Sequence, residues 1–282
     1  MTEAEAKPLR PWDRVNESQA KPAPPPHIDP AFPNVHRWDN GLVLYNDFIT
    51  KEEEAAMIAA ILEDDRWTGA GKRLSLHFGP RFDYTTFATS ETENRSLPNY
   101  ITNFISRLPI QEYLPDQFTV QYYPPGVGIP PHVDTHSAFR EALYSLSFGS
   151  TVPMAFKRCG ATEARRMRKP KRSLAGDTEK SESLTKPATQ SKIIEDADLE
   201  HWELFLPPRS LLLMMGPSRY GFTHKIRGRK FDQRDGHVIE RQGRYSITMR
   251  SVKRGDEVGC NCDFPEVCDA KIREEERQQS IP

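Results

Sequence analysis

Two metal-binding residues in the middle of the chain, His132 and Asp134, limit its possible folds more than any other stretch. They stand one residue apart, and in an extended strand the side chains at i and i+2 point to the same face. The imidazole and the carboxylate could therefore bind one metal ion. A histidine from another strand would complete a two-His-one-carboxylate set with open coordination positions, which suits non-haem Fe(II). Such a pair also occurs by chance, so this interpretation depends on the rest of the chain.

Several histidines compete for the third ligand position. His224 follows a strongly apolar segment and a Gly-Pro turn, far from His132 in the sequence. In a jelly roll, strands that are distant in sequence can face each other across one end. We therefore predict His132, Asp134 and His224 as the ligands. His201 and His237 are alternatives, but both stand among strongly polar residues.

Short apolar segments between turn-forming residues dominate the sequence, as is typical of sandwiches and barrels. The segment 210–215 is apolar throughout, so we expect a strand that is buried on both faces. The predicted strands are 41–45, 118–123, 144–148, 151–156, 202–206, 210–215 and 244–250. The sequence thus predicts a mainly β fold with flanking helices, a jelly-roll or cupin-like double-stranded β-helix.

Two segments, 50–65 and 97–108, have the apolar spacing of helices. Thr50 is the expected N-cap of the first, and Glu53 its capping-box partner. The apolar stripe of this helix is predicted to consist of Ala55, Ile58, Ile61 and Leu62. The stripe of the second helix is Ile101, Phe104, Ile105 and Leu108.

Composition divides the chain into one folded domain and several polar segments. Residues 1–36 are polar and rich in proline, so we expect a disordered leader before a domain that spans 37–270. A basic insertion at 158–198 is also expected to be disordered, and residues 271–282 form a charged tail. The basic run at 165–172 is either an RNA-binding or nuclear-import element or a solvated loop.

The net charge and the apolar segments of the sequence limit the partners and the cellular location that we expect. A formal net charge of −1 argues against a globally basic nucleic-acid binder. The sequence contains neither a transmembrane-length apolar run nor the apolar core of a signal peptide, so we expect no membrane association. A monomer in the cytoplasm, the nucleus or both is the prediction.

Three of the four cysteines crowd together as Cys260, Cys262 and Cys268. Three cysteines in so short a span indicate a zinc or iron–sulfur site rather than the disulfide framework of a secreted protein. A structural zinc site needs a fourth ligand. Cys159 is possible, but His136 is the better candidate, because it would fix the C-terminal loop to the His132 segment.

Two arginines, Arg244 and Arg250, lie on the same face of the last predicted strand. At 3.3 Å per residue they are roughly 20 Å apart along the backbone, although strand twist and long side chains can bring them closer. Each guanidinium can bind a carboxylate through two hydrogen bonds, so a dicarboxylate along the strand would use both. Two exposed strand arginines are the alternative.

The stretch 67–90 interleaves aromatic and basic residues. It is either a loop that stacks on a base and grips a phosphate backbone, or a hairpin with ordinary aromatic packing. Composition alone favours the hairpin. The residues of interest are Arg73, His77, Arg81, Phe82 and Tyr84.

The order of these motifs resembles the AlkB-type Fe(II)/2-oxoglutarate dioxygenases. The shared pattern is Tyr-x-Pro-Gly, His-x-Asp, a distal His and Arg-x5-Arg, and it covers about 41–269 without the insertion. The chain is most similar to the oxygenase domain of the tRNA wobble-uridine branch of AlkB homologues. The stretches that carry this likeness are 132–139, 145–150, 207–212 and 260–268.

This resemblance implies roles for the residues already singled out. His132, Asp134 and His224 would hold iron, and His136 with the three clustered cysteines would bind zinc. Arg244 and Tyr123 would bind the distal carboxylate of 2-oxoglutarate, while Arg250 would act near the metal. Gln121 and Ser246 stand where the family has asparagine. Residues 73–84 coincide with the family's nucleotide-recognition lid, which reverses the preference for simple packing.

The implied reaction is oxidation of a C–H bond on a modified nucleobase, with Fe(II), 2-oxoglutarate and O₂. Hydroxylation of a wobble-uridine side chain in tRNA is the expected outcome, and demethylation of N-alkylated bases in RNA or DNA is the alternative. A protein hydroxylase and a non-catalytic, zinc-stabilised module that binds RNA or protein are further alternatives. The sequence has no room for an RNA-recognition or methyltransferase domain beside the oxygenase, so we expect a separate tRNA methyltransferase or adaptor.

Overall fold

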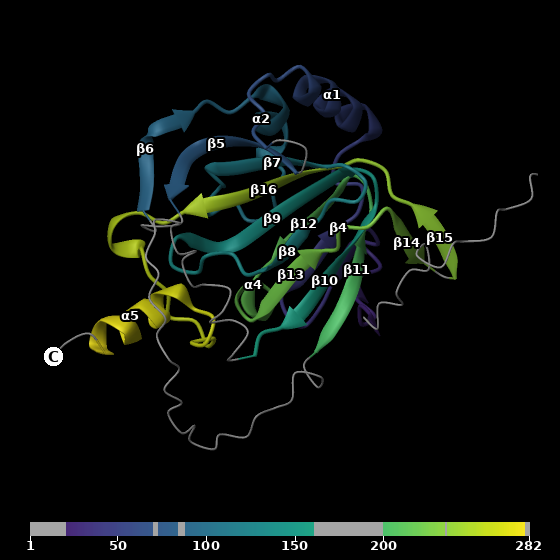
Figure 1. The fold of residues 1–282 in the computed structure, drawn as a ribbon. Helices are drawn as coiled ribbons and strands as arrows, with labels where there is room; N and C mark the ends of the chain where they lie inside the picture. Colours follow the sequence, from purple (N-terminus) through teal and green to yellow (C-terminus); the bar gives the residue numbers. More distant parts are fainter. Residues whose placement is uncertain (1–20, 70–72, 84–87, 161–199, 235, 280–282) are drawn as a thin grey trace, which may run out of the picture.

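Two β-sheets face each other in the computed structural model of the protein (Figure 1), which describes residues 21–69, 73–83, 88–160, 200–234 and 236–279. Within these residues the larger sheet has nine strands and the smaller has five. Their order is that of a jelly roll, in which strands distant in sequence become neighbours. The mainly β fold with flanking helices is confirmed.

The larger sheet runs β2-β3-β4-β12-β9-β16-β7-β5-β6. Its strands are β2 (His27–Ile28), β3 (Val35–Arg37), β4 (Leu42–Tyr45), β5 (Leu74–Asp83), β6 (Ala88–Arg95), β7 (Gln117–Tyr123), β9 (Phe139–Gly149), β12 (Ser210–Met214) and β16 (Arg244–Val252). All of its neighbouring strands are antiparallel.

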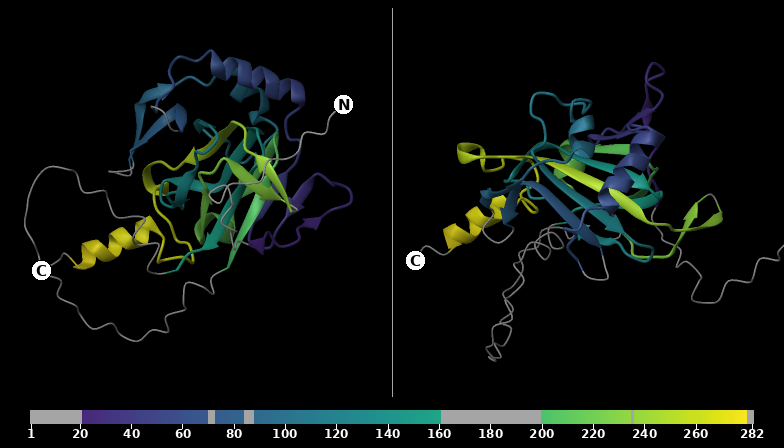
Figure 2. Two further views of the ribbon diagram at one scale, coloured as in Figure 1. Left: turned by 45° about the vertical axis from the view of Figure 1, so that its right-hand side comes forward. Right: turned by 90° about the horizontal axis from the view of Figure 1, so that it is seen from above.

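The smaller sheet runs β1-β11-β10-β13-β8. Its strands are β1 (Lys21–Pro22), β8 (Ile129–His132), β10 (Val152–Arg158), β11 (His201–Leu206) and β13 (Phe222–Ile226). A separate hairpin of β14 (Phe231–Arg234) and β15 (His237–Glu240) lies at the opposite end of the molecule from α5 (Asp269–Gln279), as Figures 1 and 2 show.

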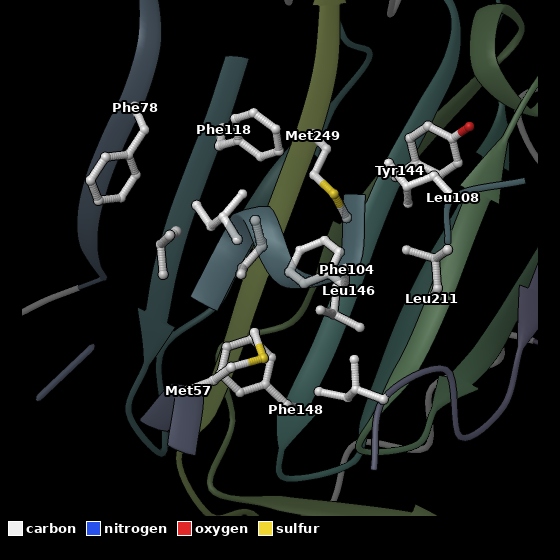
Figure 3. Close-up of a cluster of buried hydrophobic side chains, with 14 of the residues drawn as sticks. Met57, Phe78, Phe104, Leu108, Phe118, Tyr144, Leu146, Phe148, Leu211 and Met249 are labelled. Carbon is white, nitrogen blue, oxygen red and sulfur yellow. The ribbon is translucent and has the colours of Figure 1, made fainter. Parts of the chain in front are cut away.

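Helices α1 (Lys51–Leu62) and α2 (Asn99–Ile105) cover the outer face of the larger sheet. Figure 3 shows the apolar cluster between these helices and the sheet. Met57 and Phe104 of the helices pack there against Leu146, Phe148 and Leu211 of the sheet. A second cluster fills the space between the two sheets and includes Leu143, Met154, Phe156, Trp202 and Leu212. Leu211 and Leu212 thus serve different clusters, which confirms that this strand is buried on both faces.

The start of α1 agrees with the sequence, but its apolar stripe does not. The Thr50 hydroxyl accepts from the Glu53 amide at 3.1 Å, and the Glu53 carboxylate accepts from the Thr50 amide at 2.8 Å. The buried residues are Met57 and Ile61, whereas Leu62 is 66% exposed. The predicted stripe of Ala55, Ile58, Ile61 and Leu62 is therefore wrong in part. Ile58 is partly buried against the same cluster, so Met57, Ile58 and Ile61 face the sheet, whereas Ala55 and Leu62 are turned away from it.

Two predicted domain boundaries also differ from the structure. Residues 21–36, assigned to the disordered leader, contain β1, β2 and most of β3. The Ala23 amide donates to Glu203 at 3.0 Å, and the Trp38 indole donates to the Pro24 carbonyl at 2.7 Å. Proline is compatible with an edge strand, so a proline-rich composition did not reveal this pairing. Most of the predicted charged tail forms α5, while residues 1–20 and 280–282 lie outside the described residues.

The short helix α4 (Gly216–Tyr220) precedes β13, and a 3₁₀ turn, η2 (Gly255–Glu257), precedes the cysteines. None of the described helices combines the length and the apolar character that a membrane crossing requires.

The predicted basic insertion falls outside the described residues, apart from its first three positions. The Arg158 amide donates to the Glu200 carbonyl at 2.8 Å, so the ends of β10 and β11 are adjacent. We expect that deletion of residues 160–196 leaves the fold intact, because a short turn can join these ends. Thermal unfolding and gel filtration check this: the melting temperature should stay close to that of the full chain, and aggregation would contradict the prediction.

Candidate functional site

The three predicted metal ligands lie together at the edge of the smaller sheet. His132 at the end of β8 pairs with His224 in β13, and their ring centroids are 4.2 Å apart. Asp134 lies just beyond β8, with its Oδ2 at 3.5 Å from His224 Nε2. Within the described residues, one potential ligand atom from each of the three lies within 4.8 Å of the others. The i, i+2 spacing and the pairing of β8 with β13 together build this arrangement.

The alternative histidines do not join this group. His201 lies in β11 and His237 in the exposed β15, and neither belongs to a metal-ligand cluster among the residues that the structure describes. His224 is therefore the histidine that the fold brings to the His132–Asp134 pair.

Asp134 is fixed by Arg250. The guanidinium donates to Asp134 Oδ1 from Nε at 2.9 Å and from Nη2 at 2.6 Å, which leaves Oδ2 directed toward His224. Burial opposes ionisation of this carboxyl, but the charges of Arg250 and the two histidines hold its pKa below the usual range. The carboxylate is therefore ionised and oriented.

Both imidazoles are held in the neutral form that binds metals. Burial lowers the pKa of His132, and burial together with the nearby His132 lowers the pKa of His224 to about 3. His132 Nδ1 lies 2.9 Å from the Pro130 carbonyl. A carbonyl only accepts, so Nδ1 carries the hydrogen and Nε2 keeps its lone pair for a metal.

A pocket of about 60 Å³ extends from this triad between the sheets to Arg244. Arg244 and Arg250 both line it, as do the hydroxyl-bearing Thr119, Ser145, Ser246 and Thr248. The two arginines on one face of β16 thus belong to one site and are not exposed strand residues. Their spacing along the strand gives the pocket one cationic group at each end.

Arg244 is the buried cation of this pocket, with 1% of its surface exposed. Its Nη2 donates to the Ser147 hydroxyl at 2.8 Å, and its guanidinium carbon lies 5.1 Å from the centre of the Tyr123 ring. Burial lowers the pKa of Arg244. Within the described residues no carboxylate forms an ion pair with it. A buried cation without a charged partner is costly, so this environment suits the binding of an anion.

Gln121 and Tyr123 lie beside Arg244 in the same pocket. The Tyr123 hydroxyl donates to Gln121 Oε1 at 2.6 Å, so the amide orients the phenol. Ser246 pairs in register with Gln121 across β16 and β7. All three predicted accessory residues are therefore close to the cation.

The second predicted metal site is also assembled. Ligand atoms of His136, Cys260, Cys262 and Cys268 lie within 4.8 Å of one another, and Cys262 Sγ is 3.5 Å from His136 Nδ1. Cys159 is not part of this group among the described residues. Three thiols and one imidazole are a donor set that suits tetrahedral zinc.

Of the five predicted lid residues, two lie near the pocket. The first half of β5 pairs with β7 in the larger sheet, and the second half forms a hairpin with β6. His77 Nδ1 is 3.3 Å from the Thr119 hydroxyl, and the Arg73 guanidinium carbon is 5.9 Å from the centre of the Tyr123 ring.

The other three lid residues lie further along this stretch. Arg81 is exposed and pairs in register with Ser90, and the Phe82 backbone pairs with Thr89. Tyr84 lies outside the described residues.

Two buried residues next to the triad escaped the sequence reasoning. Arg219 in α4 donates to the carbonyls of Asp134 and Thr135, and Asp269 at the start of α5 accepts from the amides of His136 and Ser137. Asp269 follows Cys268 directly, and this adjacency to a predicted metal ligand was a weak sequence signal for a role at the site. Nothing in the sequence distinguishes Arg219 from a surface arginine.

Comparison with known proteins agrees with this geometry. A family model described as the 2OG-Fe(II) oxygenase superfamily matches residues 41–250, which include the triad and both pocket arginines. The chain is 34% identical over 242 residues to the "Alkylated DNA repair protein ALKBH8 homolog" of Arabidopsis thaliana, covering 82% of this chain and 63% of that protein.

A second relative comes from Xenopus tropicalis. It is the "tRNA (carboxymethyluridine(34)-5-O)-methyltransferase alkbh8", which is 31% identical over 264 residues, or 84% of this chain and 35% of that protein. The chain thus spans less than two thirds of the length of both relatives. The solved structure of OsALKBH1 overlaps with a TM-score of 0.48 at 13% identity, covering 77% of this chain and 99% of that chain.

The match over residues 41–250 includes the three candidate metal ligands and both arginines of the pocket. The chain therefore belongs to the 2OG-Fe(II) oxygenase superfamily, as an AlkB-type dioxygenase related to ALKBH8.

Proposed function

We propose that this dioxygenase oxidises a C–H bond on the side chain of a modified wobble uridine in tRNA. The observation that carries the chemistry is the single pocket that joins His132, Asp134 and His224 to a buried cation without an anionic partner among the described residues. The choice of tRNA rests on the similarity to the Xenopus relative, whose name refers to carboxymethyluridine.

The triad is suited to Fe(II), with His132 Nε2, Asp134 Oδ2 and His224 as the ligands. When bound together, Fe(II) and 2-oxoglutarate supply oxidation of the substrate by O₂, coupled to decarboxylation of 2-oxoglutarate to succinate. The protein supplies the geometry. Arg250 keeps one carboxylate oxygen of Asp134 occupied, so the other is presented to the metal.

The opposite end of the pocket is suited to the distal carboxylate of 2-oxoglutarate. Arg244 brings a charge that burial makes costly until an anion arrives, so the free energy of pairing is available for binding. Tyr123 is oriented by Gln121, and Ser246 adds a hydroxyl on the neighbouring strand. Serine and glutamine replace the family's asparagines as hydrogen-bonding groups beside this carboxylate.

The substrate reaches the pocket past β5. Arg73 and His77 lie beside the pocket residues Tyr123 and Thr119, so they are placed to contact the ribose-phosphate or the base. A tRNA loop presents an unpaired base at less cost than a duplex, from which the base must be flipped. Arg81, Phe82 and Tyr84 follow in the sequence and are further candidates for contact with the nucleotide.

Demethylation of an alkylated base is the second candidate, favoured by the Arabidopsis relative's name. It is the same oxidation on a different carbon: a hydroxylated N-methyl group leaves as formaldehyde, whereas a hydroxylated carbon substituent remains. A non-catalytic module would not require a buried Arg244 in the same pocket as the ionised, oriented carboxylate of Asp134. A separate methyltransferase would supply a methylated tRNA precursor.

Nucleoside mass spectrometry of tRNA and mRNA from cells with and without the protein tests this proposal. We expect a hydroxylated wobble-uridine nucleoside in tRNA that disappears when the gene is removed and returns with the wild-type chain but not with His132→Ala. Accumulation of N-methylated bases in cells without the protein would instead support the demethylase. If removal of the gene left the wobble-uridine nucleosides of tRNA unchanged, the wobble-uridine assignment would be contradicted.

The cysteine cluster is suited to a structural zinc ion that fixes the C-terminal loop to the β8–β9 segment. We expect Cys262→Ser to lose zinc and to lower the melting temperature by about 5 °C or more, because metal binding contributes directly to folding. Cys159→Ser is the matched control, since Cys159 lies outside the cluster and should keep both properties. Differential scanning calorimetry and metal analysis measure them, and unchanged melting of Cys262→Ser would count against a structural zinc.

A further inference from the structure

We infer that Arg219 and Asp269 act as a clamp that couples the two metal sites, so that zinc at the cysteine cluster tightens metal binding at the triad. This inference rests on the proposed metal-binding roles of both groups. The clamped segment, residues 134–137, connects β8 to β9 and contains one candidate ligand of each site, Asp134 and His136.

Among the strands that the structure describes, none pairs with this segment to fix its backbone. It lies after the end of β8 and before Phe139, where β9 begins. Its buried polar groups must therefore be satisfied in another way, because an unpaired buried amide or carbonyl is costly. Two buried side chains of opposite charge do most of this, one on the carbonyls and one on the amides, and the Ser137 carbonyl accepts from the Gly259 amide at 3.0 Å.

Arg219 holds the carbonyl side. Its Nη1 donates to the Asp134 carbonyl at 2.9 Å and its Nη2 to the Thr135 carbonyl at 2.8 Å. The side chain is 2% exposed, and the fork of the guanidinium spans two successive carbonyls. Arg219 therefore fixes the backbone from which the Asp134 carboxylate projects.

Asp269 holds the amide side. Its Oδ1 accepts from the amides of His136 at 2.8 Å and Ser137 at 3.1 Å, and its Oδ2 accepts from the Ser137 hydroxyl. Arg273, one turn further along α5, donates to the same carboxylate at 2.8 Å. Asp269 is 2% exposed, so these charge-assisted bonds form away from water.

Both clamp residues are attached to the cysteine cluster. Asp269 follows Cys268 directly in the sequence. Arg219 precedes Tyr220, whose ring packs edge-to-face on His136 with centroids 4.9 Å apart. A metal ion that joins His136 to the cysteines would thus fix the positions from which both clamp residues reach the segment.

A third contact ties the cysteine loop to the strand of His224. Gly221 directly precedes β13, and a Cβ placed there would lie 2.3 Å from the ring of Phe264. Phe264 lies between Cys262 and Cys268 in the sequence. The loop therefore packs against the backbone three residues before His224. Loosening of the loop would affect Asp134 through the clamp and His224 through this contact.

The test measures Mn²⁺ binding to the zinc-loaded protein by isothermal titration calorimetry, with zinc content and melting temperature recorded for each variant. Mn²⁺ prefers oxygen and nitrogen ligands, so it reports on the triad and not on the thiols. We expect Asp269→Asn to weaken Mn²⁺ binding by about tenfold or more, since removal of outer partners of metal ligands has effects of this size.

A second clamp variant guards against a failure of the first to fold. Arg219→Lys keeps the charge but cannot span two carbonyls, so it should also weaken Mn²⁺ binding by about tenfold. The matched controls are Asp232→Asn and Arg241→Lys, because Asp232 and Arg241 form a comparably buried pair at 2.6 Å outside the site. They should lose stability without losing Mn²⁺ affinity.

Zinc itself provides the decisive comparison. Cys262→Ser, which loses zinc, should weaken Mn²⁺ binding. Coupling between two sites is reciprocal, so saturating Mn²⁺ should tighten zinc binding to the wild-type protein by the factor by which zinc tightens Mn²⁺ binding. Unchanged Mn²⁺ affinity in Asp269→Asn, Arg219→Lys and Cys262→Ser would overturn the clamp alone. If wild type and His132→Ala bound Mn²⁺ equally, the proposed triad would fail and the clamp with it.

Discussion

Replacement of His132 by alanine is expected to abolish succinate formation and substrate oxidation while zinc remains bound. His132 provides one of three candidate ligands to the iron, and its Nε2 lone pair is kept available by the bond from Nδ1 to the Pro130 carbonyl. Loss of that ligand removes the metal on which the whole reaction depends. Succinate is measured by mass spectrometry after Fe(II) reconstitution under anaerobic conditions and addition of oxygen.

The two rejected histidines provide the controls for this experiment. His201→Ala and His237→Ala each remove an imidazole from β11 or β15, outside the triad, and should retain turnover. If His132→Ala kept its iron-dependent turnover, or lost zinc instead of iron, the two metal sites would be misassigned.

Replacement of Arg244 by glutamine is expected to raise the KM for 2-oxoglutarate by about 30-fold or more. The variant would leave the buried distal carboxylate without its charged partner, and such a loss costs about 2–5 kcal/mol, at 1.4 kcal/mol per factor of ten. In the ligand-free protein the same change removes a buried cation that has no carboxylate partner among the described residues. The melting temperature without ligand should therefore be little affected.

Arg241→Gln is the matched control for Arg244→Gln. Arg241 is also a buried arginine, but it pairs with Asp232 outside the pocket. Its loss should lower the melting temperature and leave the KM for 2-oxoglutarate unchanged. An unaltered KM in Arg244→Gln, measured by succinate release at varied 2-oxoglutarate, would show that the carboxylate binds elsewhere.

The triad could be predicted because it depends on local spacing and on strand pairing. The i, i+2 spacing of His132 and Asp134 indicated a shared face, although Asp134 lies just beyond the end of β8. The apolar segment 210–215 and its Gly-Pro turn drew attention to His224. The sequence favoured His224 over His201 and His237 because of its apolar context, but it could not show that the three ligands meet. That meeting depends on the register of β8 against β13, which is a property of the whole sheet.

The misplaced elements have a common cause, which is that composition does not report on tertiary pairing. Residues 21–36 look disordered because they are polar and rich in proline, yet β1 pairs with β11 at a sheet edge. Leu62 looks like a core residue because it is apolar, yet α1 turns it away from the sheet. In each case contacts between distant parts of the chain override the local signal.

Arg219 and Asp269 show the same limit within the site. Neither belongs to a recognisable motif, and each takes its proposed role only because the fold buries it against the 134–137 segment. A buried ion that satisfies a loop backbone has no sequence pattern of its own. By contrast, the cysteine spacing predicted a metal cluster directly, because all three thiols belong to one short loop.

One experiment addresses the proposed chemistry most directly: incubation of the Fe(II)-reconstituted protein with 2-oxoglutarate, oxygen and bulk tRNA, followed by mass spectrometry of succinate and of the digested nucleosides. We predict one oxidised wobble nucleoside for each succinate formed in the coupled reaction, and neither product with His132→Ala. Folded, iron-loaded protein that produced no succinate would contradict the account.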